Sequence, residues 1–270
     1  MNLEKRKKIV LFFWKFPQWA LAALAVGAVI VMAAEGALGY AIGLGTMGVC
    51  GAATWLWLTV RPKDVEMDAW LDEDLEKLKP RALAKSGLDS TDLVRDPVML
   101  AGPRFRNLGG AFFGFRRSKD GRARFTPAHV TIINFTEHQI VTYQCAFDMT
   151  TGNPLNECVD EYFYTDVVSV TTRSEAMTYS TGELDGRILS RIPKLVESAV
   201  NGLVQVNNAE IFVLVTAGGN STKVVLRDPV LIEGLGGGDV PMERAEQAVH
   251  AVRTMLRVKK AGALPLRTAP

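Results

Sequence analysis

The feature that most constrains the fold is a long run without any charged side chain, from Gly36 to Val60. A helix needs roughly 20 apolar residues to cross the hydrocarbon core of a bilayer, and this run exceeds that length. A second apolar stretch, Gln18 to Ala34, precedes it and reaches the short end of the same range. Because only a short break near Glu35 separates the two stretches, the sequence predicts a transmembrane helical hairpin over residues 9–62.

Two other interpretations of this apolar region stay open. The first is one membrane span with a re-entrant or interfacial helix beside it. The second is a cleaved signal peptide, which the second apolar stretch makes less favourable.

Positive charge predicts the orientation of the hairpin. Basic residues precede the first stretch and follow the second, whereas the connecting turn holds only Glu35. The basic residues are Lys5, Arg6, Lys7, Lys8, Arg61 and Lys63. Since positively charged flanks stay in the cytoplasm, both termini are expected there, with a basic cytosolic tail at 1–8, in a multi-pass protein of the bacterial inner membrane. Lys15, among aromatic residues, is expected at the level of the lipid headgroups.

A glycine pattern inside the second stretch resembles a nucleotide-binding motif. Gly43-Leu-Gly45-Thr-Met-Gly48 reads G-x-G-x-x-G. That fingerprint needs a strand before it within a βαβ unit, and a turn open to solvent for the pyrophosphate, whereas this stretch is uncharged and long enough to cross a bilayer as a helix. The sequence instead predicts close packing of membrane helices through small residues, which are Gly39, Gly43, Ala23 and Gly27. The packing partner is either the other helix or a second protomer.

Residues 63–95 are predicted to form an amphipathic juxtamembrane helical linker. Apolar residues in the segment 64–79 fall near one helical stripe, and most of the others are acidic. Pro80 is expected to end this helix, and Gly87 is a candidate C-cap of the short helix after it.

Residues 96–260 carry the period of β-strands. Strands are expected at 96–105, on both sides of Asp120-Gly121, and three times within 128–172, with a bulge or bend near Asp166. An insertion is expected at 174–208, followed by two more strands. Asp239 is a candidate N-cap of a final amphipathic helix, and 261–270 is a tail.

Four segments of this region resemble bacterial pleckstrin-homology-like (PH-like) and GRAM-type domains. They are "HVTIINFTEHQIVTY", "DEYFYTDVVSVTT", "IFVLVTAGGNSTKVVLRD" and "PMERAEQAVHAVRTMLR". The likeness covers roughly residues 125–260. It implies an α+β membrane protein in which the hairpin precedes a cytosolic PH-like β-barrel or sandwich closed by a C-terminal helix.

A basic stretch lies upstream of the expected barrel core. Arg116, Arg117 and Arg122 in this stretch, together with Lys15, are candidates for contact with anionic lipid. The alternative is a solvated loop.

The sequence contains no constellation that predicts catalysis or metal binding. His129, His138 and His250 are separated along the chain, and three scattered cysteines form no disulfide framework. The glycine-rich loop before Asp239 lacks the Lys-Ser/Thr of a P-loop. The formal net charge of +2 does not favour nucleic acid. We therefore expect no enzyme, no cofactor and no metal.

The predicted function is binding. The chain is expected to act as a membrane-anchored scaffold that recruits a protein partner or its own copies at the inner membrane. The alternative is a channel-forming or membrane-perturbing protein gated by its soluble domain.

Overall fold

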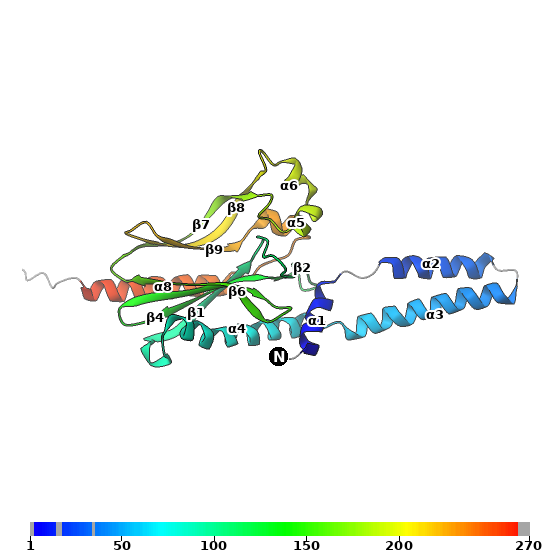
Figure 1. Ribbon diagram of the computed structural model, residues 1–270, viewed down its shortest axis with the longest axis horizontal. Helices are drawn as coiled ribbons and strands as arrows, with labels where there is room; N and C mark the ends of the chain where they lie inside the picture. The colour runs from blue at the N-terminus through cyan, green and yellow to red at the C-terminus, as the bar shows by residue number, and fades with distance from the viewer. Residues whose placement is uncertain (1–2, 15–17, 34–35, 264–270) are drawn as a thin grey trace, which may run out of the picture. The chain divides into compact units, whose positions relative to one another are not determined.

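The computed structural model describes residues 3–14, 18–33 and 36–263 (Figure 1). The chain divides into two compact units, Met1–Met67 and Asp68–Pro270. The helices are α1 (Leu3–Phe13), α2 (Gln18–Ala33), α3 (Ala37–Val60), α4 (Asp64–Ser86), α5 (Gly186–Arg191), α6 (Pro193–Glu197), α7 (Pro229–Gly234) and α8 (Glu243–Ala263), with a 3-10 turn at Ser90–Asp92. The strands are β1 (Arg95–Pro103), β2 (Gly114–Arg117), β3 (Ala123–Thr126), β4 (Ala128–Phe135), β5 (Gln139–Asp148), β6 (Asn153–Phe163), β7 (Val167–Ser180), β8 (Leu203–Thr216) and β9 (Ser221–Arg227).

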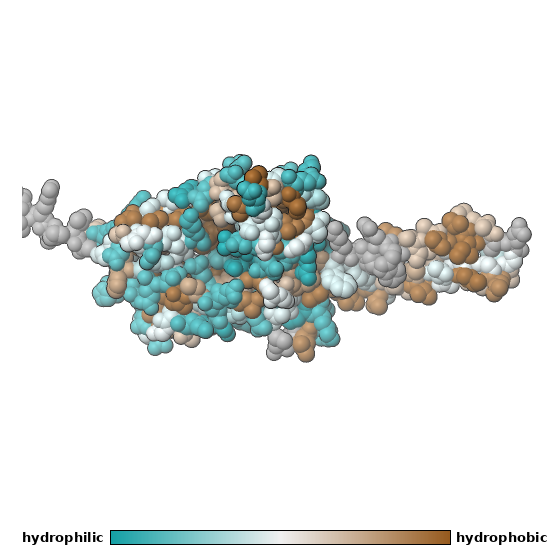
Figure 2. Space-filling model, turned by 45° about the horizontal axis from the view of Figure 1, so that its top comes forward, coloured by the Kyte–Doolittle hydropathy of each residue, from teal (hydrophilic) through white to brown (hydrophobic). Residues whose placement is uncertain are grey.

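In the first unit, α3 is long and apolar enough to cross a membrane by length and composition. Its exposed side chains are mostly apolar, as Figure 2 shows for the helical pair α2–α3. α2 has 16 residues, a length of about 24 Å at 1.5 Å per residue, which is shorter than the roughly 30 Å hydrocarbon core. The structure therefore supports one membrane-spanning candidate, and the second span of the predicted hairpin is not confirmed.

α2 and α3 approach closely at two glycines. A Cβ on Gly43 would lie 2.5 Å from the Val31 side chain and 3.0 Å from the Gly27 carbonyl oxygen. A Cβ on Gly27 would lie 3.2 Å from the Gly43 carbonyl oxygen. The two glycines predicted as packing residues thus face each other, whereas Gly39 and Ala23 are only partly buried.

The residues expected as a basic tail begin a helix instead. α1 starts at Leu3 and runs through the charged residues into the buried Ile9 and Phe12. Arg61, at the end of α3, donates to the Phe12 carbonyl at 2.7 Å and lies over the Trp57 ring at 4.4 Å. This contact fastens α1 to the end of α3 within the same unit.

The second unit contains three antiparallel sheets. Their strand orders are β1-β4-β5-β6, β2-β3 and β7-β8-β9. The sheets are not closed into a barrel, so the barrel form of the predicted fold is wrong, while the α+β class with helices followed by sheets is confirmed. β1 and β9 meet closely at Gly102, where a Cβ would lie 2.1 Å from the Val225 carbonyl oxygen. A side chain there would force the two sheets apart.

The main core lies between the four-stranded and the three-stranded sheets, and α8 completes it. Leu100, Ile133 and Phe135 come from the first sheet, and Phe212 and Leu214 from the second. α8 adds Ala245, Ala248, Val249 and Val252 to the same core. Figure 1 shows α4 on the opposite side of the four-stranded sheet from α8.

The expected third strand at 157–172 is two strands in two different sheets. β6 ends at Phe163, and β7 begins at Val167 in the second sheet. The Asp166 amide donates to the Phe163 carbonyl at 3.0 Å, and the Asp166 carbonyl accepts from Ala217. The bend predicted at Asp166 is therefore the corner at which the chain changes sheet.

The insertion is shorter than predicted, because β7 continues to Ser180 and β8 begins at Leu203. Between them α5 and α6 pack on a second core that includes Tyr179, Leu184 and Ile188.

Two helix boundaries also differ from the sequence predictions. α4 continues through Pro80 to Ser86, because Leu78 and Ala82 on either side of the proline are buried. Its C-cap at Gly87 is confirmed, since this residue has φ +64° and the Leu88 amide donates to the Leu83 carbonyl. Asp239 is not the N-cap of α8, which begins at Glu243.

Candidate functional site

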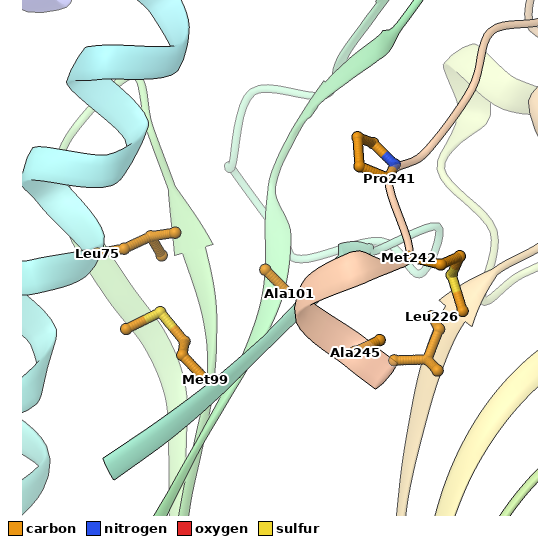
Figure 3. Close-up of a pocket in the computed structure, with 7 residues that line it drawn as sticks. All are labelled: Leu75, Met99, Ala101, Leu226, Pro241, Met242 and Ala245. Atoms are coloured by element: carbon orange, nitrogen blue, oxygen red, sulfur yellow. The ribbon is translucent and has the colours of Figure 1, made fainter. Parts of the chain in front are cut away.

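The candidate site is a groove between α4, β1 and α8 in the second unit. Figure 3 shows its narrow end, where Leu75 of α4 and Met99 of β1 point toward each other. Ala101 of β1 lies beside the first turn of α8, which contributes Ala245. The remaining lining residues are Leu226, Pro241 and Met242. This apolar cavity has a volume of about 50 Å³, room for a few water molecules or one aliphatic side chain.

The cavity opens into a wider groove of about 390 Å³ that shares Leu75 and Met99. Its other lining residues are Asp72, Glu76, Lys79, Pro97, Val98, Gln247 and Ala248. Apolar side chains therefore line the floor, and charged side chains of α4 line the rim. Lys79 and Glu76 form an ion pair at 2.7 Å on this rim.

β1 forms the floor of the groove and is also an edge strand. In the described part of the chain it pairs only with β4, with Val98 opposite Ile133 and Met99 opposite Ile132. A bulge between Arg95 and Val98 interrupts the ladder at the open end of the groove. An edge strand presents unpaired backbone groups, but Pro97 and the irregularity limit them at one end of β1, and β9 lies against Gly102 at the other. The groove therefore combines an apolar-lined pocket with a short stretch of unpaired strand edge around Val98 to Ala101.

The wall formed by α4 is fastened to the sheet by a charged cluster near its C-terminal end. Arg81 donates two hydrogen bonds of 2.7 Å to the Glu157 carboxylate on β6, and the Tyr143 hydroxyl donates a third, also of 2.7 Å. These bonds, with that from Arg81 the strongest, lower the pKa of Glu157 to about 2. Burial and the bond to Glu157 raise the pKa of Tyr143. Glu157 is therefore an anion held by α4 and β5 together.

A second ion cluster fastens the other end of α4. Arg124 on β3 is buried and donates to both Asp68 carboxylate oxygens at 2.7 Å and to Asp120. The bonds from Arg124 lower the pKa of Asp120 to about 2. Because bidentate pairs of this kind fix orientation, both ends of the α4 wall are held rigidly.

The three arginines predicted to contact lipid lie on or beside the β2–β3 hairpin, and their contact with lipid stays a prediction. Arg117 and Arg122 are exposed, Arg116 is partly exposed, and Arg124 beside them is engaged with two carboxylates. The Arg122 backbone bridges to Asp239, so the loop before α8 pairs with the β2–β3 hairpin. Lys15 lies outside the described residues.

The three histidines are not brought together. His129 is largely buried on β4, and burial together with the Arg104 guanidinium lowers its pKa to about 4. Its Nδ1 lies 3.3 Å from Nη1 of Arg104. Within the described ranges no group of His, Cys, Asp or Glu side chains could hold a metal ion. Cys145 and Cys158 are both free thiols, the first buried and the second exposed.

The groove residues were not identified as a site by sequence reasoning. Leu75 belongs to the predicted apolar stripe of 64–79, which was the only signal available. Met99 and Met242 carry no motif, and only the packed structure brings them to one cavity. Comparisons of the chain with protein-family models, with curated proteins and with solved structures found no match.

Proposed function

We propose that this protein is a membrane-anchored binding module that holds an extended segment of a partner protein in the α4–β1–α8 groove. The observation that carries the proposal is a cavity lined by apolar residues, two of them methionines, beside the partly exposed edge of β1. Methionine side chains adapt to differently shaped apolar groups, and an open edge supplies backbone hydrogen bonds. The partner segment would place one aliphatic side chain in the cavity.

The charged rim of the groove indicates which residue type in the partner segment lies next to that aliphatic side chain. α4 contributes Asp72 and Glu76 to the groove, and Lys79 neutralises part of this charge. A basic residue in the partner segment next to the aliphatic one fits this rim. The partner class is therefore an aliphatic and basic extended peptide segment.

The anchor in this proposal is the predicted hairpin, with both termini in the cytosol of a bacterial cell. The length and composition of α3 support one span, and the Gly27–Gly43 approach supports a packed partner helix. The meanders β4-β5-β6 and β7-β8-β9 and the packing of α8 on the core between their sheets support the PH-like likeness. The alternative of a channel lacks support, since α3 carries no charged residue between Ala37 and Val60.

Site-specific photocrosslinking in native membranes tests the proposal. A photoreactive amino acid is placed in the full chain at Gln247, which lines the groove, or at the exposed Arg257 on the same helix as a matched control. We expect a discrete adduct from position 247 only. Mass spectrometry is expected to map it to a segment with an aliphatic residue beside Lys or Arg.

A cavity-filling substitution makes the test specific to the groove. Ala101→Leu fills the cavity from β1, and we expect the adduct to fall at least fivefold while circular dichroism confirms an intact fold. Equal adducts at positions 247 and 257, or an adduct that Ala101→Leu leaves unchanged, would contradict the proposal.

A further inference from the structure

β7 is a second long edge strand, outside the groove. It has 14 residues and, among the described residues, its only strand partner is β8. α8 covers only its beginning, where Lys260 donates to the Val167 carbonyl and Arg253 lies 3.4 Å from the Val170 carbonyl oxygen. Among the described residues, no backbone hydrogen bond reaches residues 171–179 from any element other than β8.

The open part of β7 is regular and suited to pairing. Residues from Ser169 to Glu175 match β8 one to one, and the later irregularity adds residues to β8 near Asn208, which has φ +66°. The open segment, residues 171–180, contains neither proline nor glycine, and five of its ten residues are exposed. Natural proteins often blunt such an edge with a proline, a bulge or charged side chains; here the two charges are of opposite sign, and the irregularity between Glu175 and Met177 places its extra residue in β8.

The charges on this edge are complementary to themselves. Arg173 and Glu175 lie on the same face of β7, two residues apart, and their side chains pair at 2.9 Å. Lys223 of β9 lies 3.4 Å from Glu175 on the same face. In an antiparallel pair of two β7 strands related by a two-fold axis at Ser174, each Arg173 would stand opposite the Glu175 of the other copy.

Neighbouring registers lack this match. An axis at Arg173 would oppose two arginines, and an axis at Glu175 would oppose two glutamates. Opposite charges directly across an antiparallel pair stabilise it, and like charges destabilise it. The charge pattern therefore favours the register with the axis at Ser174, in which Arg173 and Glu175 each face an opposite charge.

We propose that two copies of this protein associate through β7, antiparallel and with the two-fold axis at Ser174, so that two three-stranded sheets become one six-stranded sheet. The occupant of the edge is a second copy of this chain. This association does not involve the α4–β1–α8 groove, so a test of it is independent of the proposed partner binding.

Cysteine crosslinking locates the axis to a single residue. In the full chain carrying Cys158→Ser, with the other two cysteines buried, Ser174→Cys would face its own copy with Cα atoms about 5 Å apart, within disulfide reach. Ala176→Cys lies four residues from its copy along the strand, about 13 Å, and is the matched control. We expect crosslinked dimer from Ser174→Cys, at least tenfold above Ala176→Cys and above the parent.

A paired substitution checks the register independently. Thr172 would face Ala176 of the second copy, so Thr172→Cys and Ala176→Cys together are expected to crosslink, although neither does alone. Crosslinking of position 176 alone at the level of position 174, or the absence of dimer from both Ser174→Cys and the double variant, would overturn the proposal.

Charge reversal tests the complementarity. Arg173→Glu or Glu175→Arg alone is expected to reduce the crosslinked fraction at position 174 at least threefold. The double reversal restores opposite charges across the axis, and the crosslinked fraction is expected to recover. Failure of the double variant to recover, while its circular dichroism matches that of the parent, would contradict the assigned register.

Discussion

Asp228 is a buried carboxylate whose ionisation opposes folding. It is fully buried at the N-cap of α7, where it accepts a hydrogen bond from the Leu231 amide at 3.1 Å. The Tyr179 hydroxyl lies 3.5 Å from its other oxygen. Burial raises its pKa to about 6, although the bonds from the Leu231 amide and the Tyr179 hydroxyl act in the opposite direction.

The raised pKa gives the sign and size of the effect. The folded protein holds this proton up to about pH 6, whereas an unfolded aspartate loses it near pH 3.9. The free energy of unfolding therefore decreases as pH rises from about 4 to 6, and the full penalty applies above pH 6. At 1.36 kcal/mol per pKa unit the penalty at pH 7 is about 3 kcal/mol.

Asp228→Asn tests this reasoning, because asparagine also caps helices and has nearly the same shape. We expect the variant to gain about 1–3 kcal/mol at pH 7.5, the lower figure allowing for an imperfect bond to Tyr179. The gain is expected to vanish near pH 4. The assay is thermal unfolding of the full chain in detergent, followed by circular dichroism of the β-sheet signal at several pH values.

The control is Asp239→Asn, since Asp239 is an exposed carboxylate 3.7 Å from Arg227. It removes one negative charge without relieving a buried one, and we expect a change below about 0.5 kcal/mol. If Asp228→Asn lowered the melting temperature at every pH, or shared the pH slope of the parent, the buried charge would not be the source of the penalty.

Three further changes test the packing of α4 on its sheet and of α2 on α3. Leu75→Ala removes a side chain that is 2% exposed and is expected to cost about 2–5 kcal/mol, measured by denaturant unfolding; a loss below 1 kcal/mol would mean that α4 is not packed on the sheet. Glu157→Ala leaves the Tyr143 hydroxyl and Arg81 without their carboxylate and is expected to cost about 1–3 kcal/mol, against little change for the exposed Glu161→Ala on the same strand. Gly43→Leu places a side chain against the Gly27 backbone and is expected to increase protease cleavage between α2 and α3 in detergent, whereas Gly45→Leu, which meets open space, is not.

The sequence predicted correctly those features that depend only on neighbouring residues in the chain. The helix C-cap at Gly87 and the turn at Asp120-Gly121 follow from backbone preferences of single residues, and both were predicted. The change of sheet at Asp166 was predicted only as a bend, because a strand that turns a corner keeps its alternating pattern on both sides. The prediction that Pro80 ends the helix was wrong, because the burial of Leu78 and Ala82 outweighs the local preference of proline to end a helix.

The groove could not be predicted, because its residues have ordinary core character when they are considered one at a time. Leu75 of α4 and Met99 of β1 meet Met242, which comes much later in the chain just before α8, and in the sequence each of these residues looks like an ordinary core residue. The cavity arises because Ala101 and Ala245 are small where α8 crosses β1, so the facing side chains do not meet. Filling that space within the chain would need only one larger residue at either alanine. Ala101→Leu therefore separates two explanations of the cavity. If the cavity is a packing defect, the added side chain stabilises the fold and no adduct is lost. If it is a binding site, the fold is preserved and partner capture is lost.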